Sequence, residues 1–148
     1  MSTETPVEVL KDAASKWRLQ KYGQGNDARY GLLQVPSNTF FAKTETITVS
    51  TDGGIGLELV EAVDMGDGLG GLVMVGGVKP GSNAEKTGQF NVGDVIYGVM
   101  LKGEVFQPNC EGLNYDLTLD RIIACSEKAA GTELVVTVQR VVEVGGAD

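Results

Sequence analysis

A glycine-rich turn that opens directly into a strand constrains this chain more than any other stretch. The turn is Gly53-Gly54-Ile55-Gly56, and Leu57 and Leu59 then alternate with a polar residue. Glycine adopts positive φ and lets another chain approach closely because it has no Cβ, and alternation with a period of two is typical of a strand. Such a turn can point successive N–H groups at one external anion. The stretch therefore favours peptide capture over catalysis.

The remainder of the chain indicates short strands joined by tight turns. Its 148 residues include 21 glycines but only four prolines, a composition that suits many turns. Strands are predicted over 44–50, 55–63, 72–75, 95–101 and 134–142. A short helix capped by Ser82 or Asn83 is predicted to run through Thr87, and a long one over 119–130, capped by Thr118 and ended by Gly131. The expected fold class is mostly β with two helices (α+β).

Residues 1–43 form an N-terminal extension with a predicted helix over about 6–22. Thr5-Pro6-Val7-Glu8 has the features of a helix start. One face of this helix would be apolar and the opposite face basic: Val7, Leu10, Ala14 and Trp17 against Lys11, Lys16, Arg18 and Lys21. A basic amphipathic helix either docks peripherally on a membrane or partner, or packs on its own domain. Both alternatives stay open at this point.

The second half of the extension is predicted to dock on the body of the protein. Leu32, Leu33 and Val35 read as a short extended piece, and the adjacent Phe40 and Phe41 would be costly to leave exposed together. The main domain is predicted over 44–142, and residues 143–148 form a tail.

The net charge of −8 argues against a nucleic-acid surface. Residues 1–43 carry a net charge of +2 and the rest −10, so the extension either lies on the acidic body by attraction or is independently solvated. No apolar run approaches the roughly 20 residues of a membrane span, and the N-terminus lacks a signal-peptide pattern. We expect a soluble intracellular or organellar protein; the compartment is not indicated, because a removed targeting peptide would leave no trace.

No catalytic, metal or cofactor site is predicted. The chain has no histidine, so histidine-based triads are impossible, and Cys110 and Cys125 match no metal-ligand spacing. Gly66, Gly68 and Gly71 spell G-x-G-x-x-G, but a strand follows them and the aspartates beside them would repel phosphate. We expect a protein that is not an enzyme.

Three stretches, in the same order along the chain, resemble a PDZ domain over about residues 44–142. Gly54-Ile55-Gly56-Leu57 resembles the carboxylate-binding G-Φ-G-Φ loop of that family, and residues 79–99 resemble its middle segment. Residues 118–123, followed by Gly131 and an apolar strand, resemble its second helix and closing strand. The resemblance implies a PDZ-like, partly open antiparallel β-barrel or sandwich capped by a short and a long helix.

The resemblance also implies a function and a site. The module would bind a protein or peptide C-terminus by strand addition between the strand 55–63 and the helix 119–130. The carboxylate loop would be Gly54, Ile55, Gly56 and Leu57, and the peptide groove would be lined by Leu59, Leu119, Ile123 and Ser126. Because Leu119 stands where one large specificity class carries histidine, the implied ligand ends in hydrophobic-x-hydrophobic-COOH.

Two features depart from the family pattern, and an alternative function follows. Thr51-Asp52-Gly53 stands where many members carry Arg or Lys, and Ser126 replaces an apolar groove residue. The alternative is a structural or accessory subunit of a larger complex, in which the extension docks and the groove is unused or filled internally. Residues 1–43 resemble no family that we can name.

Overall fold

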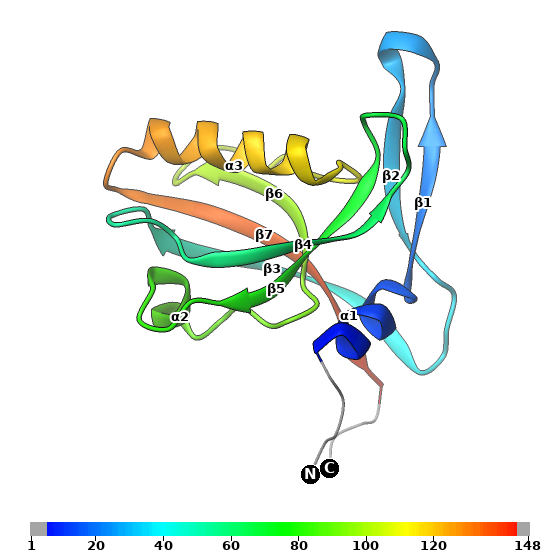
Figure 1. Cartoon of the computed structure of the whole chain (residues 1–148), viewed down its shortest axis with the longest axis horizontal. Helices are drawn as coiled ribbons and strands as arrows, with labels where there is room; N and C mark the ends of the chain where they lie inside the picture. Colours follow the sequence, from blue (N-terminus) through cyan, green and yellow to red (C-terminus); the bar gives the residue numbers. More distant parts are fainter. Residues whose placement is uncertain (1–5, 145–148) are drawn as a thin grey trace.

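The computed structural model describes residues 6–144, and these form a mostly β protein with three α-helices (Figure 1). In chain order the elements are α1 (Pro6–Ala14), β1 (Trp17–Tyr22), a short 3-10 turn (Gly25–Asp27), β2 (Arg29–Gln34), β3 (Phe40–Ser50), β4 (Leu57–Asp64), β5 (Gly71–Val78), α2 (Asn83–Thr87), β6 (Val95–Leu101), α3 (Tyr115–Ala129) and β7 (Glu133–Glu143).

Five of the strands form one antiparallel sheet in the order β3-β7-β6-β5-β4. Within the described residues this sheet stays open, with β3 and β4 at its two edges. The strands β1 and β2 form a separate hairpin that stands at one end of the sheet (Figure 1). The fold class expected from the sequence is therefore confirmed.

Strand β5 is buried on both faces of the sheet, and this divides the interior into two cores. Val73 and Val75 face the core beneath α3, whereas Leu72 and Met74 face a second core with Trp17. All four side chains are at most 3% exposed. Since alternate residues of a strand point to opposite faces, the N-terminal segment supplies the layer that covers the face opposite α3.

The predicted helix over 6–22 is too long, because the observed helix ends at Ala14 and β1 begins at Trp17. Trp17 can extend the apolar stripe of the predicted helix. It also alternates, together with Leu19, with the polar residues Arg18 and Gln20, and this period of two is typical of a strand. Pairing with β2 and burial of Trp17 in the second core decide in favour of the strand.

The predicted basic helix face is consequently not formed. Lys16 lies beyond the helix, where it contacts Asp12 at 3.1 Å and lies 5.5 Å from the centre of the Phe40 ring. Lys21 lies on β1, 3.9 Å from Asp67. The predicted peripheral docking on a membrane or partner required this basic helix face, which the structure does not contain within residues 6–144. The predicted cap Thr5 and the tail residues 145–148 lie outside the described residues.

The predicted boundary between residues 43 and 44 falls inside β3, which pairs with β7 without interruption from Phe40↔Glu143 to Ser50↔Glu133. Of the two adjacent phenylalanines, Phe40 is half-buried but Phe41 is 46% exposed, so the expected burial of Phe41 was wrong. Neighbouring residues of a strand point to opposite faces, so both rings cannot enter the same core.

Helix α3 begins four residues earlier than predicted, at Tyr115 rather than Leu119. Its N-cap is Asn114, whose side chain accepts the N–H of Leu117 at 3.0 Å. Thr118, the predicted cap, is fully buried and donates its hydroxyl to the carbonyl of Leu113. The predicted cap of α2 is confirmed, since Ser82 Oγ accepts the N–H of Glu85 at 3.2 Å.

The glycine run 66–71 forms the turn between β4 and β5 and holds the β1–β2 hairpin in place. Asp67 accepts the hydroxyl of Tyr30 at 2.7 Å and the N–H groups of Leu69 and Gly70 at 3.0 Å. The hydrogen bonds from Gly70, Tyr30 and Leu69 lower the pKa of Asp67 to about 2. Asp67 therefore has a structural role in this turn.

Candidate functional site

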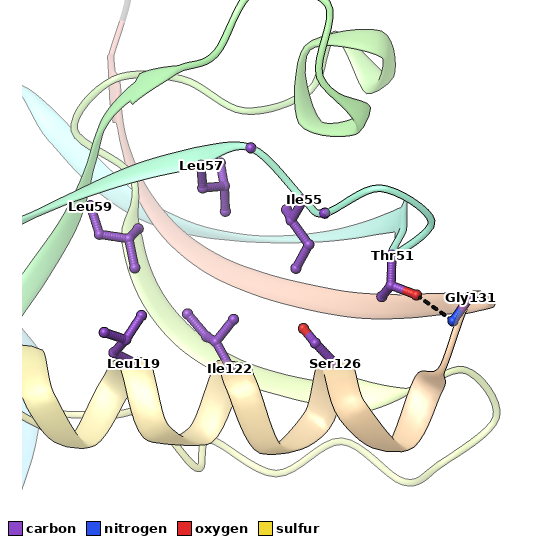
Figure 2. A pocket seen from close by; sticks show the side chains of 10 residues that line it. Thr51, Ile55, Leu57, Leu59, Leu119, Ile122, Ser126 and Gly131 are labelled. Carbon is purple, nitrogen blue, oxygen red and sulfur yellow. Dashed lines mark hydrogen bonds between the residues drawn. The ribbon is translucent and has the colours of Figure 1, made fainter.

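A groove with a volume of about 280 Å³ lies between β4 and α3 (Figure 2). One wall comes from the glycine turn and β4, and the other from one face of α3. None of its lining side chains is charged, and most are apolar; the lining residues are Thr51, Gly54, Ile55, Gly56, Leu57, Leu59, Leu119, Ile122, Ser126 and Gly131.

The two walls follow from the periodicities of a strand and a helix. Leu57 and Leu59 are two residues apart and point toward α3, while Val60 points to the opposite face and packs in the second core. On α3, Leu119 and Ile122 are three residues apart and so share a face of the helix. The groove is therefore a half-covered part of the core beneath α3.

Most of the predicted site residues are brought together in this lining: Gly54, Ile55, Gly56, Leu57, Leu59, Leu119 and Ser126. Ile123 is not among them, because it is 47% exposed and Ile122 lines the groove in its place. The buried positions of α3 are Thr118, Ile122 and Ala129. Since each helical residue turns by about 100°, the residue after Ile122 points well away from the sheet.

Sequence reasoning also missed Thr51 and Gly131 as lining residues. The Thr51 hydroxyl donates to the carbonyl of Thr132 at 2.9 Å and accepts the N–H of Gly131 at 3.1 Å (Figure 2). This contact ties the glycine turn to the C-terminal end of α3 and closes one end of the groove. Thr51, a polar residue just before the glycine turn, was the available signal in the sequence. Its partner Gly131 lies 80 residues away, so the sequence did not indicate this contact.

Four carbonyl groups of the glycine turn accept hydrogen bonds from α2 or from Lys79, the residue that follows β5. Asn83 Nδ2 donates to the carbonyl oxygens of Asp52 and Gly54, both at 2.7 Å. The carbonyl of Ile55 accepts the N–H of Ala84, in the first turn of α2, at 2.8 Å. The carbonyl of Gly56 accepts the N–H of Lys79, directly after β5, at 2.9 Å.

The N–H groups of Ile55, Gly56 and Leu57 consequently point away from α2. In a trans peptide the N–H and the preceding C=O point in opposite directions, and the chain has no cis peptide within residues 6–144. Over the same range no acceptor engages the N–H of Ile55 or Gly56. The closed end of the groove thus presents successive backbone donors, the arrangement that binds an anion.

Strand β4 forms the wall with a free edge. Within the described residues it pairs with β5 alone, so its outer edge is available for another strand. Each β4 residue from Leu57 to Glu61 has a partner on β5, because the register shift between Glu58 and Leu59 places its extra residue on β5. A second shift, between Glu61 and Val63, places its extra residue on β4 and interrupts the edge. A guest strand would therefore find a regular edge of five residues.

The two cysteines lie outside the groove lining and are both free. Burial raises the pKa of Cys110 to about 12 and also raises the pKa of Cys125. A raised thiol pKa lowers reactivity, because the thiolate is the nucleophile.

Over residues 6–144, no cluster of three or more potential metal-ligating side chains is present. No helix in that part of the chain has the length and apolar character needed to cross a membrane.

Comparisons with known proteins give likenesses in structure but none in sequence families. No family model matches the chain, and no curated protein matches it. Among solved structures, the N-terminal PDZ domain of InaD in complex with a NorpA C-terminal peptide is similar, with a TM-score of 0.44 and 19% sequence identity. The likeness covers 67% of this chain and 98% of that one. This likeness is distant.

Proposed function

We propose that this protein is an interaction module that captures the C-terminus of a partner peptide by strand addition in the β4–α3 groove. One observation carries the proposal: backbone donors at Ile55 and Gly56 stand at the closed end of an apolar groove whose wall is an edge strand. The terminal carboxylate of a guest peptide would accept hydrogen bonds from these backbone donors, and its main chain would pair with the free edge of β4. An apolar side chain of the peptide would fill the groove.

The expected affinity is modest. Three or four backbone hydrogen bonds at about 1 kcal/mol each and one buried side chain at about 2 kcal/mol give a binding free energy of about −6 kcal/mol, or tens of micromolar. Leu59 and Leu119 face each other with apolar groups at the end of the groove away from Thr51 (Figure 2). A ligand of the form hydrophobic-x-hydrophobic-COOH is therefore favoured, since a hydroxyl there would lose water without a partner.

The test compares matched peptides that end in a free carboxylate or in an amide. We expect the amide to bind at least tenfold more weakly by isothermal titration calorimetry, because it removes the charge that the loop donors receive. A library of random C-terminal peptides would supply the starting sequence. Equal affinity for acid and amide would contradict terminal capture, and the absence of any binding peptide would contradict the function.

Replacing Gly56 by alanine is expected to reduce peptide binding more than tenfold. Gly56 has φ of +89°, and an added Cβ would lie 2.1 Å from Cβ of Ser82, so the turn must move and carry its donors with it. Binding to the best peptide is measured by fluorescence polarisation. The control is Gly81→Ala, which has a similar φ of +76° but open space around it and lies outside the lining. Equal loss in both variants would show general strain, not damage to the loop.

A further inference from the structure

The end of the groove opposite the glycine turn carries an anchored carboxylate. Leu57, Leu59 and Glu61 are alternate residues of β4, so all three point toward α3. Glu61 Oε2 accepts the N–H of Tyr115, the first residue of α3, at 2.7 Å. This side chain therefore spans from one wall of the groove to the other at its open end.

Glu61 keeps the capacity to bind a further donor in this position. An ionised carboxylate has about four lone-pair sites on two oxygens, and the contact with Tyr115 uses only one of them. Glu61 is exposed, and Asp116, also exposed, lies in the first turn of the same helix. The open end of the groove is thus negatively charged, in contrast to the uncharged lining.

The regular edge of β4 sets how a guest strand would align with Glu61. The edge contains the five residues from Leu57 to Glu61, and the four steps between them span about 13 Å at about 3.3 Å per residue. In a guest strand that starts from its carboxylate at the glycine turn and runs antiparallel to β4, side chains 0, −2 and −4 face α3. The first two meet the apolar lining, and the third reaches the level of Glu61.

We propose that the groove selects a Lys or Arg four residues before the peptide C-terminus, through Glu61. This inference rests on the proposed function and adds a specificity residue to it. The bulge after Glu61 ends the regular edge at the same level, so position −4 is the last guest residue that the strand can hold in register. A cationic side chain there would contact a carboxylate already held in place by Tyr115.

The experiment uses three otherwise identical peptides with Lys, Gln or Glu at position −4 and a free carboxylate. On the unmodified protein we expect the Lys peptide to bind about two- to fivefold more tightly than the Gln peptide, the range for a partly exposed ion pair. The Glu peptide should bind more weakly than both. The preference should decrease with added salt.

Glu61→Gln should remove the preference while leaving the Gln peptide bound, because the amide oxygen can still accept the N–H of Tyr115. The matched control is Glu58→Gln, since Glu58 loses the same charge but its side chain lies against Gly77, away from the groove. This control should keep the preference for Lys. Melting curves of both variants check that the fold is retained.

The outcomes separate this inference from the proposed function. Binding of all three peptides with equal affinity would overturn the role of Glu61 and leave terminal capture standing. A Lys preference that survives in Glu61→Gln, or that Glu58→Gln removes equally, would show general charge attraction and also overturn it. Failure of every free-carboxylate peptide to bind would overturn both proposals together.

Discussion

Replacing Trp17 by alanine should lower the free energy of unfolding by about 3–5 kcal/mol, the usual cost of removing a large aromatic side chain from a core. Trp17 is 9% exposed and packs in one cluster with Leu72, Met74 and Val95. These neighbours lie on β5 and β6, so the cavity would open between the N-terminal layer and the sheet. Urea denaturation followed by far-UV circular dichroism measures the loss.

The control for Trp17 is Phe41→Ala, because Phe41 is also an aromatic residue of the N-terminal segment but is 46% exposed. We expect the control to cost less than about 1 kcal/mol. A Trp17 variant as stable as the control would show that the N-terminal layer adds little to the fold. Val60 of β4 packs on the same cluster, so the Trp17 variant should also bind peptide more weakly if the layer supports the groove wall.

Replacing Arg140 by methionine should also destabilise the protein by about 3–5 kcal/mol, because it leaves a buried charge without its partner. Asp94 is 1% exposed, and Arg140 contacts both of its oxygens, Nε to Oδ1 at 2.9 Å and a terminal nitrogen to Oδ2 at 2.7 Å. Arg140 also donates to the carbonyl of Gln89 at 2.8 Å. The pair therefore joins β7 to the loop before β6. Thermal and urea unfolding at pH 7 measure the effect.

A second substitution distinguishes a stranded charge from lost packing. Asp94→Asn removes the charge, and its amide oxygen can still accept the N–H of Asn91, which Asp94 accepts at 2.9 Å. The double variant with Arg140→Met should therefore be more stable than Arg140→Met alone. Lys102→Met is the exposed control: its partner Glu133 lies 3.0 Å away with both side chains about half exposed or more, so we expect a loss below about 1 kcal/mol. Equal losses at Lys102 and Arg140 would contradict the argument from burial.

The fold and much of the groove could be predicted because their signals are local. The alternation of Leu57 and Leu59 after a glycine turn indicates a strand, and Ser82 before a short helix indicates a cap; the structure contains both. The glycines of the turn were also informative, since Gly53, Gly54 and Gly56 all have positive φ. These features depend on neighbouring residues, which the sequence displays directly.

Other features could not be predicted, because they depend on residues far apart in the chain. The segment from Trp17 to Tyr22 fits a helical stripe and an alternating strand equally well, and pairing with β2 selected the strand. Ile122 and Ile123 are identical in type and adjacent, so only the direction of the sheet decides which one lines the groove.

The sequence by itself therefore determined the glycine turn, the alternating strand after it and a later helix with one apolar face, because each follows from local backbone preference and periodicity. Only the tertiary structure decided what those elements enclose. It placed Asn83 where it turns the loop carbonyls toward α2, so that the N–H groups face the other way, and it carried Glu61 across to the start of α3. Those contacts join residues 29 to 54 positions apart, and their energy arises only when packing brings the partners within hydrogen-bonding distance.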